Sequence, residues 1–193
     1  MCTLLLSACS GGGHTTAAEP PSTASNGPTT VEARAADSRA LDCRDPIAAM
    51  ATPRTGYAYQ VIGDAVAIVT STTSKAALQT SATGDPNPSK RLFAKNGLLV
   101  RKNTRSEFVV PTTWHNRLSF LWGNAGPQVP TEHLVVGPCD SAAEWVAFPG
   151  GYVVAEPACV SFVVRTTDGD HQVKVGVGAP CDGQRPPPQP TDS

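Results

Sequence analysis

The segment from Cys159 to Cys181 constrains the fold most, because it reads as two alternating strands around Asp168-Gly169. An Asp-Gly pair favours a two-residue hairpin loop, since both residues tolerate the positive φ angles of a type I′ turn. With that loop, the apolar residues of both strands fall on one face and the polar residues on the other. The segment therefore predicts an antiparallel hairpin with one buried face. The expected facing pairs are Val160 with Val177, Phe162 with Val175, and Val164 with Val173.

Further short β-prone runs bounded by Gly, Pro or Asn predict an all-β protein. They lie at residues 98–101, 107–110, 117–122, 134–136, 145–148 and 152–154, and a second hairpin is expected from 57–62 and 65–70 around Gly63-Asp64. The best helix candidate, residues 74–81, is too short to define a fold. We therefore predict an immunoglobulin-like antiparallel β-sandwich of about nine short strands, stapled by disulfides.

Composition divides the 193 residues into a folded part and tails. Residues 9–40 are rich in Gly, Ala, Thr, Ser and Pro and offer almost nothing bulky to bury, which predicts a disordered tether. Residues 182–193 form a proline-rich tail that is also expected to be disordered. The β-sandwich domain is expected at residues 41–181, a length sufficient for a core of its own.

The N-terminus carries the motif Leu6-Ser7-Ala8-Cys9, in which two small residues separate an apolar residue from a cysteine. This motif resembles the lipobox of bacterial lipoproteins. The resemblance implies a diacylglyceryl group on the Cys9 thiol, palmitate-type acyl chains, and removal of a signal peptide at residues 1–8. No Lys or Arg precedes Cys9, so we expect the true start of the signal peptide to lie upstream. The alternative is a cytosolic protein that carries the motif by chance.

The remaining cysteines predict disulfides. Of the six cysteines, Cys2 lies in the expected signal peptide and Cys9 carries the expected lipid. The other four suit two bridges in an oxidising compartment, and none forms the Cys-x-x-Cys pair of a zinc knuckle or a thioredoxin. Three pairings are possible. We prefer Cys43 with Cys139 and Cys159 with Cys181.

Several phrases between residues 90 and 181 resemble a family of uncharacterised exported proteins and lipoproteins of high-GC Gram-positive (actinobacterial) bacteria. The resemblance implies an exported β domain with structural cysteines, and it assigns no site residues. The phrases are Lys95-Asn96-Gly97-Leu98-Leu99-Val100-Arg101, Trp122-Gly123-Asn124, Trp145 followed by Phe148-Pro149-Gly150-Gly151-Tyr152-Val153-Val154, Pro157-Ala158-Cys159-Val160, and the closing Gly176-Val177-Gly178-Ala179-Pro180-Cys181.

No contiguous catalytic motif is present: the sequence has no Gly-x-Ser-x-Gly, Ser-x-x-Lys or His-Glu-x-x-His pattern. A triad from scattered residues stays open, with Ser161 or Ser119 joined to His133 or His171 and an aspartate. Metal binding would need converging ligands, and the cluster of Asp168, Asp170 and His171 is better explained as a solvated turn. We therefore expect no cofactor and no metal, and we favour a non-catalytic protein over an enzyme with a site assembled from scattered residues.

Two weaker patterns indicate binding. Trp145 and the Phe148–Tyr152 turn could line a pocket for sugar or peptide, although such aromatics more often fill a core. A basic stretch could contact anionic wall polymer or phospholipid headgroups, although charges also protect a strand edge from aggregation. This stretch consists of Lys90-Arg91, Lys95, Arg101-Lys102 and Arg105.

A net charge of −1 provides no electrostatic basis for nucleic-acid binding. The sequence thus predicts a lipid-anchored, non-catalytic module on the outer face of the cell membrane that binds an envelope protein or wall polymer. The alternative is an envelope hydrolase whose site is assembled from scattered residues. A pocket that brings His115, His133 or His171 within hydrogen-bond reach of a Ser or Asp would favour the hydrolase.

Overall fold

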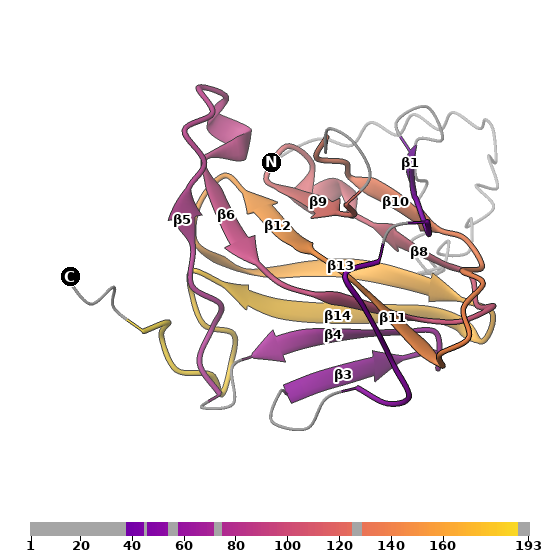
Figure 1. Ribbon diagram of the computed structural model, residues 1–193. Helices are drawn as coiled ribbons and strands as arrows, with labels where there is room; N and C mark the ends of the chain where they lie inside the picture. The colour runs from indigo at the N-terminus through magenta and orange to yellow at the C-terminus, as the bar shows by residue number, and fades with distance from the viewer. Residues whose placement is uncertain (1–37, 45, 54–57, 72–74, 125–128, 189–193) are drawn as a thin grey trace, which may run out of the picture. The chain divides into compact units, whose positions relative to one another are not determined.

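The computed structural model describes residues 38–44, 46–53, 58–71, 75–124 and 129–188. The expected signal peptide, Cys9 and tether residues 9–37 lie outside them. By internal contacts the chain divides into Met1–Thr30 and Val31–Ser193, and everything described below belongs to the second unit. The described residues form fourteen strands in three sheets, with no α-helix (Figure 1). None of them forms a helix long and apolar enough to span a membrane.

All neighbouring strands in the three sheets are antiparallel except β1 and β10, which run parallel. The first sheet has the order β1 (Ser38–Leu41), β10 (His133–Val136), β8 (Ser106–Val109), β13 (Ala158–Thr166) and β14 (Gly169–Val177). The second has the order β2 (Ala48–Met50), β11 (Trp145–Phe148), β7 (Leu98–Arg101), β4 (Val66–Ser71) and β3 (Ala58–Ile62). The third has the order β5 (Ser81–Ala82), β6 (Leu92–Lys95), β12 (Gly150–Val154) and β9 (Leu118–Trp122). Two 3₁₀ turns, η2 (Pro88–Lys90) and η3 (Thr112–Trp114), join strands.

Side chains from all three sheets pack into one apolar core. Aromatic rings form its centre, with centroid separations of 5.1 Å between Trp122 and Tyr152 and 5.2 Å between Phe120 and Phe162. Such pairs add about 0.5–1.5 kcal/mol beyond the burial of their area. The all-β prediction is confirmed, and sheets packed over one core agree with the expected sandwich. More strands exist than the nine expected, because several have only two to four residues.

Two short connections join the second and third sheets. The first leads from the third sheet to the second, and the other leads from the second sheet to the third. The chain passes from β6 to β7 through Asn96, whose backbone N–H donates to the Gly150 carbonyl at 2.7 Å. It passes from β11 to β12 through Pro149. A Cβ added to Gly151 would lie 1.9 Å from the Ala94 carbonyl oxygen, so only glycine allows this approach. The Pro149-Gly150-Gly151 segment is therefore a corner where strands change sheets.

The β13–β14 hairpin differs from its predicted register. Thr166 pairs with Gly169, so the loop is Thr167-Asp168 and not Asp168-Gly169. The Thr166 hydroxyl donates to the Asp168 carboxylate and lies 3.2 Å from the Gly169 carbonyl oxygen, and these contacts hold the displaced two-residue loop. The shift by two residues leaves the faces as predicted, because strand side chains alternate with period two. The observed pairs are Val160 with Val175, Phe162 with Val173, and Val164 with His171.

The second predicted hairpin is confirmed in the described residues. β3 and β4 pair in antiparallel fashion around Gly63 and Asp64, which have φ angles of 53° and 48°. The Ala65 N–H donates to the Ile62 carbonyl at 3.1 Å, which closes the type I′ turn expected from these residues. Tyr57, the first residue of the predicted hairpin, lies outside the described residues.

The helix expected at 74–81 is wrong for the residues described, 75–81. Ala76 and Leu78 instead form parallel bridges with Arg185 and Val177, because their backbone groups find partners in the C-terminal chain. The same bonds extend the folded part beyond the expected end at residue 181, and residues 189–193 lie outside the description. At the other end, pairing of β1 with β10 begins the fold at Ser38, inside the expected tether.

The preferred disulfide pairing is confirmed. Cys43 and Cys139 follow the parallel strands β1 and β10 at the same end, which brings their Cα atoms to 5.3 Å. Cys181 reaches Cys159, at a Cα separation of 4.8 Å, after the chain turns at Gly178 with a φ of 69°. Two disulfides indicate an oxidising, extracytoplasmic environment for this domain.

Candidate functional site

A groove of about 630 Å³ opens between the first and third sheets, and we call it the β9–β10 groove. Six segments contribute to it: β1, η2 with its cap, the end of β8, the turn after η3, β9, and the chain entering β10. Its described lining residues are Ser38, Arg39, Asn87, Ser89, Lys90, Val109, Val110, His115, Asn116, Ser119, Val129, Pro130, Thr131, Glu132 and His133.

Two permanent cations line the groove from different segments. Arg39 of β1 is half-buried, and its Nη2 donates to the Trp122 carbonyl of β9 at 2.8 Å. Burial lowers the pKa of the Arg39 guanidinium. Lys90 is the last residue of η2, and none of the described carboxylates lies within ion-pair distance of it. The groove thus has one cation fixed by the fold and one on its rim.

Each groove histidine faces a glutamate. His115 Nε2 lies 3.9 Å from Glu132 Oε2, and the Asn116 N–H donates to the other oxygen of Glu132 at 2.6 Å. His133 Nε2 lies 3.2 Å from Glu107 Oε2, and the His133 side chain is only 14% exposed. The contact with Glu107 holds the His133 ring in the wall, whereas His115 is more exposed and only approaches Glu132.

Glu107 itself is held by two neighbouring side chains, Arg105 and His133. Burial opposes its ionisation, yet hydrogen bonds from Arg105 and His133 leave the pKa of Glu107 below its ordinary value. The Arg105 Nη2 lies 3.2 Å from Glu107 Oε1. Glu107 is therefore ionised beside the groove, where it orients the His133 ring.

The groove brings Ser119 into the same wall as His115 and His133, but it does not assemble the anticipated triads. Within the described residues, no histidine ring is hydrogen-bonded to a serine. Ser161 lies on β13 and accepts from Gln172 Nε2 at 3.2 Å. His171 lies 3.1 Å from Asp168, but this contact is at the hairpin tip, outside the groove.

The hairpin tip does not gather a metal site. Asp168 contacts Thr166 and His171, while Asp170 lies 3.4 Å from Arg165. The hydrogen bond from Thr166 and then that from His171 lower the pKa of the Asp168 carboxyl. Among the residues described, no group of three or more His, Cys, Asp or Glu side chains could hold a metal ion.

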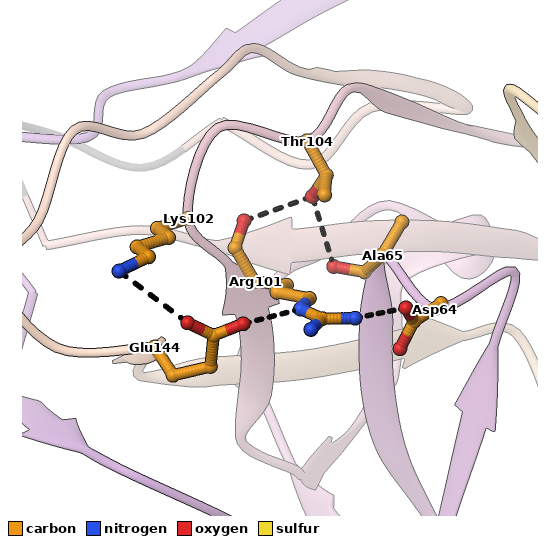
Figure 2. Close-up of polar contacts among 6 residues, drawn as sticks. All are labelled: Asp64, Ala65, Arg101, Lys102, Thr104 and Glu144. Atoms are coloured by element: carbon orange, nitrogen blue, oxygen red, sulfur yellow. Dashed lines mark hydrogen bonds and ion pairs between the residues drawn. The ribbon is translucent and has the colours of Figure 1, made fainter.

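Figure 2 shows how carboxylates divide the predicted basic stretch. Arg101 donates from Nε to Glu144 Oε1 at 2.6 Å and also contacts Asp64, while Lys102 lies 3.4 Å from Glu144 Oε2. The Thr104 hydroxyl donates to the Arg101 carbonyl at 2.8 Å and closes the turn after β7. With Arg105 on Glu107, three of the six cations are paired. The stretch is thus not one cationic surface, and Lys90 belongs to the groove instead.

The aromatic residues predicted to line a pocket lie in the core or at its edge. Phe148 and Tyr152 are fully buried in the main core, where Trp122 is buried as well, and Trp145 is 6% exposed and packs in a second, smaller apolar cluster. The Trp122 Nε1 donates to the Asn96 carbonyl at 2.8 Å, which ties the indole to the corner. The aromatic pocket is therefore wrong, and Trp122 stabilises the place where strands change sheets.

Sequence reasoning missed most of the groove. Arg39 falls inside the expected tether, and Glu132 is marked only by its neighbour His133. No protein-family model matches the chain, and no curated protein matches it. The geometry of the groove is therefore the basis for a functional assignment.

Proposed function

We propose that this chain is a lipid-anchored, non-catalytic cell-envelope module that binds its ligand in the β9–β10 groove. The observation that carries the proposal is the composition of that groove. Six segments bring cations, imidazoles and hydroxyls to one cavity, and each imidazole faces a glutamate. A hydrolase would need a base directed at a nucleophile. The contacts of His115 and His133 with glutamates, and not with a serine, support a binding surface over a hydrolytic site.

The anchor part of the proposal depends on Leu6-Ser7-Ala8-Cys9, which resembles a lipobox, and on the likeness to exported actinobacterial lipoproteins. Each buried CH₂ of an acyl chain contributes about 0.8 kcal/mol, so two or more chains on Cys9 would hold the protein firmly at a membrane. The two disulfides support an address outside the cytoplasm. The Gly- and Pro-rich segment after Cys9 would let the domain reach envelope ligands.

A bulky side chain at Ser119 tests the use of the groove, since Ser119 lines it from β9. Wild type, Ser119→Trp and Gln172→Trp would each be expressed as the full chain, cross-linked in the envelope and purified after detergent solubilisation. The measurement is the amount of cross-linked component that is purified with each form. Gln172 lies on the exposed face of β14 and serves as the matched control. We expect Ser119→Trp to lose at least tenfold of the bound component and Gln172→Trp to retain it. Equal capture by all three would reject the groove as the binding site.

A further inference from the structure

We infer that the β9–β10 groove binds an oxyanion, a phosphate ester or a carboxylate, carried by a ligand of about sugar size. This inference rests on the proposed function and specifies its ligand. It begins with the charge of the wall: Arg39 and Lys90 are cationic, and Glu132 is the one carboxylate among the described lining residues. Among the described lining residues, the two cations outnumber the one carboxylate, so these groups give the groove a net positive charge.

Glu132 is already engaged by the protein. One of its oxygens accepts from the Asn116 N–H at 2.6 Å, and the other faces His115 at 3.9 Å. Its single negative charge is outnumbered by the two cations of the wall, Arg39 and Lys90. Glu107, which contacts His133, is paired with the Arg105 guanidinium. The carboxylates near the groove thus contact its histidines, while Lys90 keeps its ammonium available.

Neutral donors complete the site for an oxyanion. Ser38, Ser89 and Ser119 contribute hydroxyls from three segments. The Asn87 side-chain oxygen accepts from the Ser89 N–H at 2.9 Å, which leaves the Asn87 amide nitrogen as a donor. Hydroxyl and amide donors beside a cation are the groups that bind phosphate and carboxylate oxygens through charge-assisted hydrogen bonds.

Size and composition set the class of ligand. A volume of about 630 Å³ lies within the range of small-molecule sites, so the groove fits one sugar or glycerol unit with its charged group. No Phe, Tyr or Trp is among the described lining residues. A neutral sugar would therefore lack an aromatic face to stack on, and recognition must come from the anionic group.

The test measures binding of three probes to the full chain in a neutral polyoxyethylene detergent, by titration calorimetry. The probes are sn-glycerol 3-phosphate, D-glucuronate and the neutral D-glucose. Lys90→Gln removes the rim cation, and Lys174→Gln removes an exposed cation of β14 as the matched control. We expect at least one anionic probe to bind, glucose to bind at least tenfold more weakly, and Lys90→Gln to weaken the anion by roughly tenfold. Lys174→Gln should bind like wild type.

The outcomes separate the sources of the anion. Preference for sn-glycerol 3-phosphate supports a phosphate ester of a headgroup or polymer, and preference for D-glucuronate supports an acidic sugar. The inference is overturned if glucose binds as tightly as both anions. It is also overturned if Lys90→Gln binds the anionic probes like wild type. If no probe binds while Ser119→Trp still abolishes envelope capture, the oxyanion is wrong and the groove stays a binding site. If Ser119→Trp also has no effect, the proposed function fails as well.

Discussion

At the scale of single residues, one close approach decides whether a strand can change sheets. Gly151 lies against the Ala94 carbonyl, where any Cβ would lie 1.9 Å from oxygen. Gly97 lies in the connection between β6 and β7, and a Cβ added there would meet nothing within 4 Å. The structure therefore requires glycine at position 151, whereas it has room for a side chain at position 97.

Gly151→Ala is expected to destabilise the domain by about 3 kcal/mol or more, because backbone must move to admit the methyl group. Gly97→Ala is the matched control and should change the free energy of unfolding by less than about 1 kcal/mol. Urea denaturation followed by tryptophan fluorescence measures both. Equal effects of the two substitutions would contradict the assignment of Gly151 as the corner.

The pair of Glu107 and His133 predicts a pH dependence of stability. The pKa of Glu107 is lowered in the fold, so its ionised form stabilises the folded state above the unfolded-state pKa. That contribution is lost as pH falls through the folded-state pKa. Glu107→Gln should therefore lose less than about 1 kcal/mol at pH 7, and its difference from wild type should shrink below about pH 4.

Urea denaturation at several pH values measures this difference. Glu156→Gln is the control, because Glu156 pairs with Arg117 on the surface and its side chain is 62% exposed. The control should follow wild type at every pH. A difference between Glu107→Gln and wild type that is the same at pH 7 and at low pH would exclude the linkage.

At the scale of elements, the two disulfides close chain segments of different length. Cys43 and Cys139 join residues 96 apart and secure the parallel edge pair β1–β10, whereas Cys159 and Cys181 close a segment of 22. Loop entropy predicts about 4.7 kcal/mol for the longer closure and about 3.4 kcal/mol for the shorter one. The longer bridge also holds β1, which carries Arg39 into the groove.

The ranking of the two disulfides by stabilisation can be tested with two variants, each replacing both cysteines of one bridge by alanine. Replacing Cys43 and Cys139 should lower the free energy of unfolding more than replacing Cys159 and Cys181, by about 1 kcal/mol. Only the first variant should also weaken ligand binding, because β1 is an edge strand. Circular dichroism would confirm that both variants fold before urea denaturation is compared. A larger loss from the shorter bridge would disprove the ranking.

At the scale of the whole molecule, the anchor and the folded domain make separable predictions. If Cys9 carries the proposed diacylglyceryl group, labelling cells with a radioactive fatty acid should tag the wild-type chain and leave Cys9→Ala unlabelled, because the variant lacks the thiol that would hold the lipid. Cys9→Ala should also leave the membrane fraction, while Cys43 and Cys139 stay oxidised in any exported material. Equal labelling of both forms would end the lipoprotein interpretation.

The sequence determined those features that depend on neighbours along the chain. Alternation placed Val160 and Phe162 on the buried face, because side chains of a strand alternate whatever it pairs with. Gly63 and Asp64 specified their turn through their own backbone preferences. The even count of four cysteines predicted two bridges. It did not select among the three possible pairings, and the structure confirmed the preferred one.

Only the tertiary structure decided the rest. The hairpin register differs by two residues from the one that Asp168-Gly169 predicted, and the Thr166 hydroxyl contacts Asp168 and Gly169 at the observed tip. The groove joins Arg39, Lys90 and His115, which are far apart in sequence and meet only where the first and third sheets approach. Local propensity carries no information on such meetings, because they depend on which strands pair across the whole chain.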